Sequence, residues 1–263
     1  MNDRIVPEWM EAFATFVEKR LPIEPYEWLP VCIGYCHARQ KNPKPDDFYF
    51  SFLESAHDIK ADFGTEEGLK QLQLCFRKFW RIAAHMNDEG ILKKLITFVI
   101  YRWGGLGQNE DEALKRSERL LKHFDLKSDT FKFIDMNKTD RFDLVALSKI
   151  AAWINPEYQI YDSRVSFALN ALYREFNEIH SQYPKVLPLP LASRRMTWPE
   201  EFKNCRRMTD REVNCSFYGD YLKLLRLVKE KSNSEKFSCE TKIEQALFMF
   251  GKKELDKYST KRK

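Results

Sequence analysis

Apolar side chains recur every three or four residues along most of the chain, which is the period of an amphipathic α-helix. In residues 7–20, for example, Trp9, Phe13 and Phe16 share one face, and Pro7 suits a first helical turn. The pattern predicts further helices over 26–38, 46–60, 66–86, 90–103, 110–124, 139–155, 163–179, 217–231 and 240–253. Strand patterns are weak, so we predict an all-α fold with less than about a tenth of the residues in strands.

The apolar helix predicted over 90–103 runs into the sequence WGGLG at 103–107. Three glycines in four positions end a helix and let backbones approach closely. We therefore expect a single all-helical unit over 1–263 with two lobes that join near 104–110. The N-terminal lobe would be 1–105, and the second lobe, 106–263, would carry the segment 139–175.

Composition limits the class of protein. The chain has 263 residues, of which 43% are hydrophobic and 14% aromatic, so it can bury the core of one large domain or two small ones. No apolar run approaches the roughly 20 residues that cross a bilayer, and four acidic residues stand among the first 20. We expect a soluble, cytoplasmic protein with no membrane partner.

The six cysteines are scattered, and reduced thiols are expected. Cys32, Cys36 and His37 are candidate metal ligands. However, a spacing of four also places two small apolar residues on one helix face, and no second pair stands at zinc-site spacing. We therefore predict neither a metal site nor a cofactor.

The formal net charge is +5, which permits a polyanionic partner without requiring one. Basic residues gather in the segment 185–211: Lys185, Arg194, Arg195, Lys203, Arg206, Arg207 and Arg211. This segment lies in a Pro-rich stretch, 180–215, that is long for a connection inside a compact domain. It is either a solvated loop or a surface for nucleic acid.

The segment 139–175, TDRFDLVALSKIAAWINPEYQIYDSRVSFALNALYRE, carries the candidate chemistry. It predicts a helix, a short second helix from Ser148, a stop at Asn155-Pro156, and an extended return that leads to a helix opened by Asp162. From Lys149 to Asn155 a helix rises about 9 Å. The return can span up to about 20 Å, so the chain can bring Asp162 back to Lys149.

Asp162 and Lys149 each have a chemical and a structural interpretation. As the cap of helix 163–179, Asp162 would be a fixed carboxylate that can stabilise positive charge on a sugar. If Trp153 and its apolar neighbours shelter Lys149, its uncharged amine would be a nucleophile. Alternatively, Asp162 is only a helix cap and Lys149 a solvated lysine.

Together, LSKIAAWIN and IYDSRV resemble the signature of the helix–hairpin–helix DNA glycosylases, most closely their 8-oxoguanine glycosylase-like bacterial branch. In the resemblance, Lys149 matches the family's Schiff-base lysine and Asp162 its catalytic aspartate. Weaker similarity extends to RWGG at 102–105, Tyr218-x2-Tyr221 and IEQALFMFG at 243–251. The resemblance implies a two-lobed helical bundle of that glycosylase type.

The implied activity is base flipping followed by excision of a modified or damaged base from double-stranded DNA, which leaves an abasic site. The family label suggests oxidised guanine. Proteins of this bacterial branch also resemble anti-phage enzymes, whose targets would be modified cytosines of phage DNA. The Pro-rich basic stretch 181–214 is our candidate for setting that choice.

The chain departs from the family pattern in two places. The family's hairpin contains glycines whose N–H groups grip a DNA phosphate, whereas the corresponding DLVALS has none. Lys149 and Asp162 are 13 residues apart (162 − 149), several fewer than usual. The firm similarity covers about 143–170, and the first hundred residues carry no family signal.

Several further residues are candidates for contact with DNA. The candidates for stacking on a flipped base or holding phosphate are Trp103, Trp153, Tyr158, Tyr161, Phe167, Trp198, Arg164, Arg194, Arg195, Arg206 and Arg207. Core packing is the commoner role of such aromatic residues. The main alternative function is a non-catalytic helical DNA-binding or interaction module. A nuclease ranks lower, because no carboxylate pair has metal-site spacing.

Overall fold

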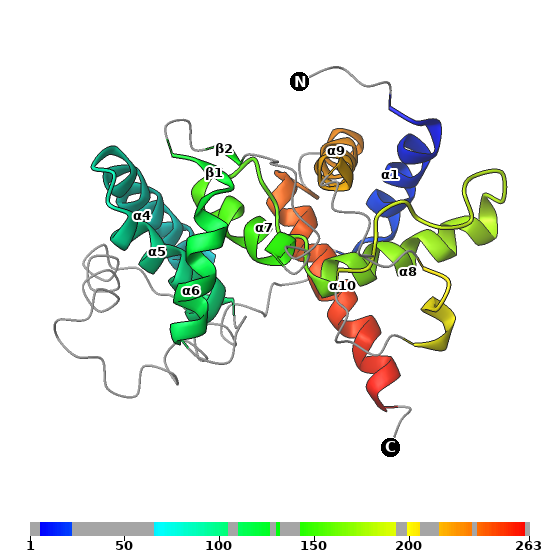
Figure 1. Ribbon diagram of the computed structural model, residues 1–263. Helices are drawn as coiled ribbons and strands as arrows, with labels where there is room; N and C mark the ends of the chain where they lie inside the picture. The colour runs from blue at the N-terminus through cyan, green and yellow to red at the C-terminus, as the bar shows by residue number, and fades with distance from the viewer. Residues whose placement is uncertain are drawn as a thin grey trace. The chain divides into compact units, whose positions relative to one another are not determined.

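The computed structural model describes residues 6–22, 66–104, 110–126, 130–131, 143–192, 199–205, 216–232 and 236–260. The helices predicted over 26–38 and 46–60 lie outside these residues, as do Cys32, Cys36 and His37. The described residues confirm the all-α class (Figure 1). Their strands are confined to β1 (Phe124–Asp125) and β2 (Thr130–Phe131), an antiparallel pair. Among the described helices, none combines the length and the apolar character that crossing a membrane requires.

The chain forms two compact units, and they are not the two lobes expected from the sequence. The first unit holds α1, α8, η2, α9 and α10, and the second holds α4, α5, η1, α6, the two strands and α7. The division into 1–105 and 106–263 is corrected for a physical reason. Helix α1 packs on α8 and α9, while α5, η1 and α6, on both sides of 104–110, pack on one another.

The first unit is built around α8 (Ser163–Ile179), which packs against α10 (Glu240–Thr260) and α1 (Glu8–Arg20). Helix α9 (Ser216–Lys231) covers α1. The buried ring of Phe13 meets Tyr173 edge to face at a centroid distance of 4.9 Å, and Phe176 at 5.4 Å. The 3-10 helix η2 (Glu200–Phe202) adds the ring of Phe202, 4.6 Å from that of Phe167. Aromatic contacts therefore fix α8 in the middle of this unit.

The second unit is built around the indole of Trp153. It contains α4 (Glu66–His85), α5 (Glu89–Thr97), η1 (Phe98–Trp103), α6 (Glu110–Leu121) and α7 (Asp143–Ile154). The rings of Phe76, Phe98 and Trp103 lie edge-on to Trp153, at centroid distances of 5.2, 5.6 and 5.1 Å. The carbonyl of Trp153 accepts a hydrogen bond of 3.0 Å from Arg77 Nε. This cation satisfies the carboxyl end of α7.

The helix predicted over 90–103 changes its winding before it ends. After α5 the chain continues as the π-helix η1, and the N–H of Gly104 donates to the carbonyl of Val99, 2.8 Å away. A Cβ at position 104 would lie 2.6 Å from that same oxygen. Glycine is therefore needed for the wide turn to close. π-Helical turns are rare and are frequent at functional sites.

Two helical glycines of the first unit provide a matched pair of substitutions. A Cβ on Gly251 would overlap the backbone carbonyl of Arg164, where α10 crosses α8, whereas one on Gly219 of α9 would meet nothing within 4 Å. Gly251→Ala is expected to lower the free energy of unfolding by about 2–3 kcal/mol. Gly219→Ala should leave it unchanged or raise it by up to about 1 kcal/mol. Urea unfolding measures both, and equal effects would contradict this packing.

Candidate functional site

Asp162 is the N-cap of α8, as the sequence predicts. Its backbone is extended (φ −116°, ψ −174°), and its Oδ1 accepts hydrogen bonds from the N–H groups of Arg164 (2.9 Å) and Val165 (3.1 Å). The residue is 8% exposed. The carboxylate is thus fixed at the positive end of a 17-residue helix. Such a group can stabilise positive charge that develops beside it.

Three buried tyrosines hold the extended segment that leads to Asp162. Tyr218 donates its hydroxyl proton to the carbonyl of Gln159 (2.7 Å), and Tyr221 donates to that of Ile160 (2.9 Å). Tyr161 donates to the carbonyl of Pro190. Tyr218 and Tyr221 are three residues apart and so lie on one face of α9. This spacing lets both hydroxyls fix the backbone of the residues directly before Asp162. The sequence suggested Tyr218 and Tyr221 only through the weak family similarity.

Burial raises the pKa of two tyrosines in the first unit. The pKa of Tyr173 rises to about 12 because the ring is desolvated. The pKa of Tyr221 rises well above its ordinary value, first through burial and then through the negative charges of Glu244 and Asp162 and the neighbouring Tyr218 and Tyr161. Both hydroxyls therefore stay protonated and keep donating over the ordinary pH range.

These raised pKa values predict a loss of stability in alkali. Above pH 10 the unfolded chain releases tyrosine protons that the folded chain keeps, so the free energy of unfolding should fall between about pH 10 and 12. The expected slope is up to about 1.4 kcal/mol per pH unit for each tyrosine. Urea unfolding from pH 8 to 11.5 measures it. Tyr173→Phe should be less stable at pH 8 but lose less on going to pH 11.5, and parallel curves would contradict the assignment.

Lys149 lies inside the second unit, on α7. It is only 5% exposed, and its Nζ stands 5.4 Å from the ring centroid of Trp103. Its aliphatic stem passes Gly104, where a Cβ would come within 3.3 Å of Lys149 Cδ. The shelter expected for this amine is therefore present, and Trp103 at the end of the π-helix supplies the ring over which it lies. The alternative of a solvated lysine is wrong.

The predicted second helix that starts near Ser148 is also corrected. Helix α7 runs without a break from Asp143 to Ile154, so Lys149 stands in its middle. The segment DLVALS lacks the glycines that a tight hairpin needs, and Ser148 Oγ simply donates back to the carbonyl of Val145 at 3.1 Å. No glycine hairpin for phosphate occurs over 143–154.

Most of the aromatic candidates for base stacking belong to the core. Trp153, Tyr161 and Phe167 are fully buried, and Trp103 is 3% exposed. Other rings of the protein pack against Trp153, Tyr161 and Phe167, so the structure gives these three side chains a role in the core. Tyr158 is half-buried and remains a candidate. Trp198 lies outside the described residues.

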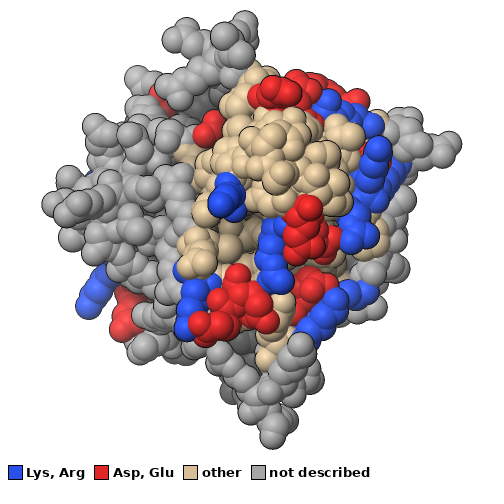
Figure 2. All heavy atoms as spheres, turned by 90° about the vertical axis from the view of Figure 1, so that its right-hand side faces the viewer, with Lys and Arg blue, Asp and Glu red and all other residues tan. Residues whose placement is uncertain are grey.

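The basic candidates divide in a similar way. Arg164 is half-buried beside Asp162, with its guanidinium 4.6 Å from the ring centroid of Phe248 on α10. Lys203 pairs with Glu200. The residues Arg194, Arg195, Arg206 and Arg207 lie outside the described residues. On the face shown in Figure 2, basic and acidic side chains are interspersed, and the described part of this face has no area of a single charge.

The candidate residues form two separate groups. Lys149, Trp103, Trp153 and Tyr158 belong to the second unit, and Asp162, Tyr161 and Arg164 belong to the first. The boundary falls between Tyr158 and Gln159, within the connection from α7 to α8. Each unit thus supplies one half of the predicted centre, and the pairing of Lys149 with Asp162 stays a prediction.

Within the described ranges, no three His, Cys, Asp or Glu side chains gather in a way that could hold a metal ion. No protein-family model, curated protein or solved structure matches the chain. The chemical features of the two groups are a lysine buried over an indole and a carboxylate fixed by backbone N–H groups.

Proposed function

We propose that this protein is a DNA glycosylase that excises a modified or damaged base from double-stranded DNA in the cytoplasm. One observation supports it most: Lys149 is buried against Trp103, and Asp162, only 13 residues later (162 − 149), is a buried and fixed carboxylate. Burying a lysine or a carboxylate costs free energy, and the two N–H groups at the start of α8 offset that cost for Asp162. Sheltered amines and carboxylates of this kind are common at catalytic sites.

The proposed reaction takes place on a nucleotide that has been turned out of the duplex. The bond between C1′ and the base nitrogen breaks, and its electron pair leaves with the base, which takes up a proton. Asp162 stabilises the positive charge on the sugar. The Nζ of Lys149 forms the new bond to C1′ and gives one proton to solvent. The C1′–O4′ bond then breaks, O4′ takes up a proton, and an imine joins Nζ to C1′ of the opened sugar. In the alternative mechanism, Lys149 does not attack. Asp162 instead positions a water molecule that attacks C1′, and an abasic site results.

The proposal covers two classes of substrate. These are oxidised guanine and the modified cytosines of phage DNA, the latter in antiviral defence. The structure gives part of the Pro-rich stretch 181–214 a structural task, because the carbonyls of Pro184 and Pro190 accept hydrogen bonds from Tyr173 and Tyr161. We therefore propose that the residues of that stretch beyond Pro190 determine which base is excised.

The proposal is tested with duplexes that each carry one modified base. After incubation with the protein, half of each sample is treated with alkali, which cleaves abasic sites, and half is left untreated. Cleavage in both halves indicates attack by Lys149 with strand scission, and cleavage after alkali alone indicates water attack. Retarded mobility of duplexes without cleavage of any of them would contradict a glycosylase and support the alternative.

That alternative is a non-catalytic DNA-binding module. The unbroken course of α7 favours it, because the hairpin that positions a glycosylase on phosphate does not occur over 143–154. In this interpretation Asp162 only caps α8, a task that its two hydrogen bonds fulfil. However, the module requires Lys149 to contact phosphate, and a side chain that is 5% exposed is poorly suited to that.

Both interpretations predict that the basic segment 185–211 contacts the DNA backbone. Replacing Arg194, Arg195, Arg206 and Arg207 together with Gln should weaken binding to all sequences alike. The slope of log K against log salt concentration should become shallower by about 3 to 4, because each phosphate contact contributes about 0.9. Binding titrations at 50 to 200 mM salt measure the slope. An unchanged slope would assign these four side chains to solvent.

A further inference from the structure

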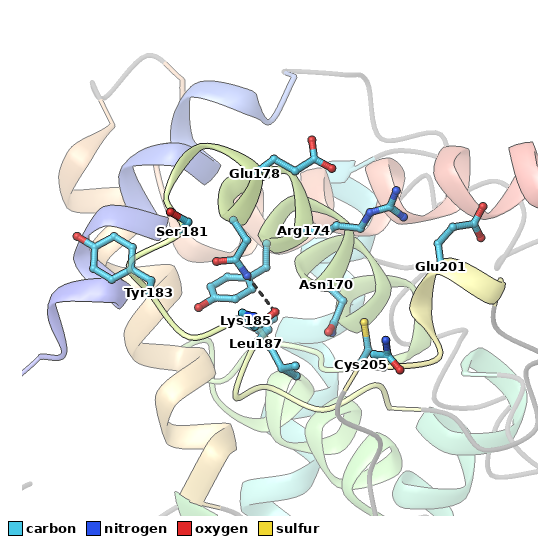
Figure 3. Close-up of a pocket in the computed structure, with 13 residues that line it drawn as sticks. Asn170, Arg174, Glu178, Ser181, Tyr183, Lys185, Leu187, Glu201 and Cys205 are labelled. Carbon is cyan, nitrogen blue, oxygen red and sulfur yellow. Dashed lines mark hydrogen bonds between the residues drawn. The ribbon is translucent and has the colours of Figure 1, made fainter.

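A cavity of about 370 Å³ opens on the side of α8 away from its N-cap (Figure 3). Its walls come from α8, from the connection 181–187 and from residues 201–205 around η2, all within the first unit. The side chain of Asn170 points across it toward Cys205. Asn170 is eight residues beyond Asp162 (170 − 162), which is about 12 Å along the helix axis. The cavity is therefore distinct from the site at Asp162.

Three polar side chains in the wall of the cavity, those of Asn170, Tyr173 and Asn177, donate to backbone carbonyls of the protein. Asn177 Nδ2 donates to the carbonyls of Pro184 and Lys185, at 3.1 Å each. Its Oδ1 is buried and has no hydrogen-bond partner. A buried acceptor without a partner costs about 1–3 kcal/mol. Asn177 thus presents an unsatisfied acceptor that the amino group of a ligand would satisfy after a small movement of the amide.

Asn170 and Tyr173 also use their donor atoms within the protein. Asn170 is 3% exposed, and its Nδ2 donates to the carbonyls of Ser166 (2.8 Å) and Leu189 (3.4 Å), which fixes the amide and leaves Oδ1 as an acceptor. The hydroxyl of Tyr173 donates to the carbonyl of Pro184 at 2.8 Å, and its raised pKa keeps that proton in place. Three side chains therefore offer acceptor oxygens to the cavity.

The remainder of the wall is apolar, and the charges at its edge are balanced, so the cavity does not favour a ligand of either charge. Tyr183, Val186 and Leu187 supply aromatic and aliphatic surface. The exposed charged residues at its edge are two cations and two anions: Arg174, Lys185, Glu178 and Glu201. Apolar walls with a few placed polar groups are typical of small-molecule sites, and the volume lies in their usual range of about 300–1,000 Å³.

We propose that this cavity binds an uncharged molecule, up to the size of a nucleoside, that presents an amino group to the asparagine acceptors. Pairs of nucleosides can show whether the cavity recognises an amino group or only binds apolar surface. Cytidine carries an amino group where uridine has a carbonyl oxygen, and adenosine differs from inosine in the same way. The proposal does not rest on the activity proposed above, since binding is measured without DNA.

The test is calorimetric titration of the full chain with cytidine, uridine, adenosine and inosine. At least one amino nucleoside should bind with a Kd of about 1 mM or below, and its carbonyl counterpart should bind at least about tenfold more weakly, a difference of about 1.4 kcal/mol. Val186→Trp should fill the cavity and weaken binding at least about tenfold. Val186 is 40% exposed, so the larger side chain does not have to enter the core.

Ile179→Trp is the matched control, because Ile179 is 69% exposed at the end of α8 and does not line the cavity. It should leave binding unchanged, as should Asp162→Asn. The proposal is overturned if neither amino nucleoside binds, if the carbonyl counterparts bind equally well, or if Val186→Trp has no effect. Binding lost in Asp162→Asn but kept in Val186→Trp would move the ligand to the cap and also overturn it.

Discussion

Asp162→Asn is expected to keep the fold and DNA binding and to reduce base release by at least about 10²–10³-fold. Asn caps a helix as well as Asp does, and its amide oxygen can accept from the N–H groups of Arg164 and Val165. The substitution therefore removes the negative charge and little else. If the charge stabilises a cationic sugar, the loss appears in the chemical step rather than in binding.

The chain offers a matched control for this substitution. Asp88 caps α5 in the second unit, where its Oδ1 accepts from the N–H of Ile91 at 3.0 Å. Asp88→Asn makes the same chemical change at another cap and should leave base release unchanged. Single-turnover assays, with thermal unfolding to verify the fold, compare the two. Full activity in Asp162→Asn would show that Asp162 is only a cap.

Lys149→Gln is expected to remove a covalent complex that borohydride traps between the unaltered protein and its substrate DNA. The imine forms by attack of a lysine amine on C1′ of the sugar. Lys149 is 5% exposed and lies over an indole, whereas most lysines are solvated. The expected loss of crosslink is complete, because no amide can form an imine.

Lys78→Gln is the control for this experiment, because Lys78 is an exposed lysine of α4. Its crosslink should equal that of the unaltered protein. Denaturing gels of borohydride-treated mixtures measure the complex, and melting curves establish that Lys149→Gln is folded. Base release without any crosslink would show that Lys149 only positions groups and that water attacks the sugar.

Local signals in the sequence were sufficient for the elements next to the site. The helix over 163–179 was predicted to the residue, because Asp162 begins it through its own side chain and no distant contact is needed. The sequence also predicted the extended return, which Asn155-Pro156 starts. In contrast, α10 continues past the predicted end at 253 to Thr260, since Gly251 is a point of close approach to α8 rather than a stop.

Features that depend on distant contacts were not predictable. Trp103 and Lys149 are 46 residues apart (149 − 103), and only the packing of η1 on α7 brings the indole under the amine. The π-helix η1 takes part in this packing, and the period of the apolar residues does not distinguish it from an α-helix. The two units were missed because α1 joins the carboxyl-terminal helices through aromatic contacts that no local pattern reports.

The proposed activity is the release of a base from DNA, which identification of the released molecules measures without a reporter. The protein is incubated with oxidised DNA and with phage DNA that carries modified cytosines, and molecules below the size of a nucleotide are identified by mass spectrometry. This measurement requires no prior choice of base. We predict a free modified base with the unaltered protein and with Asp88→Asn, and none with Asp162→Asn. Bound DNA that yields no free base, or equal release by Asp162→Asn, would contradict the proposed activity.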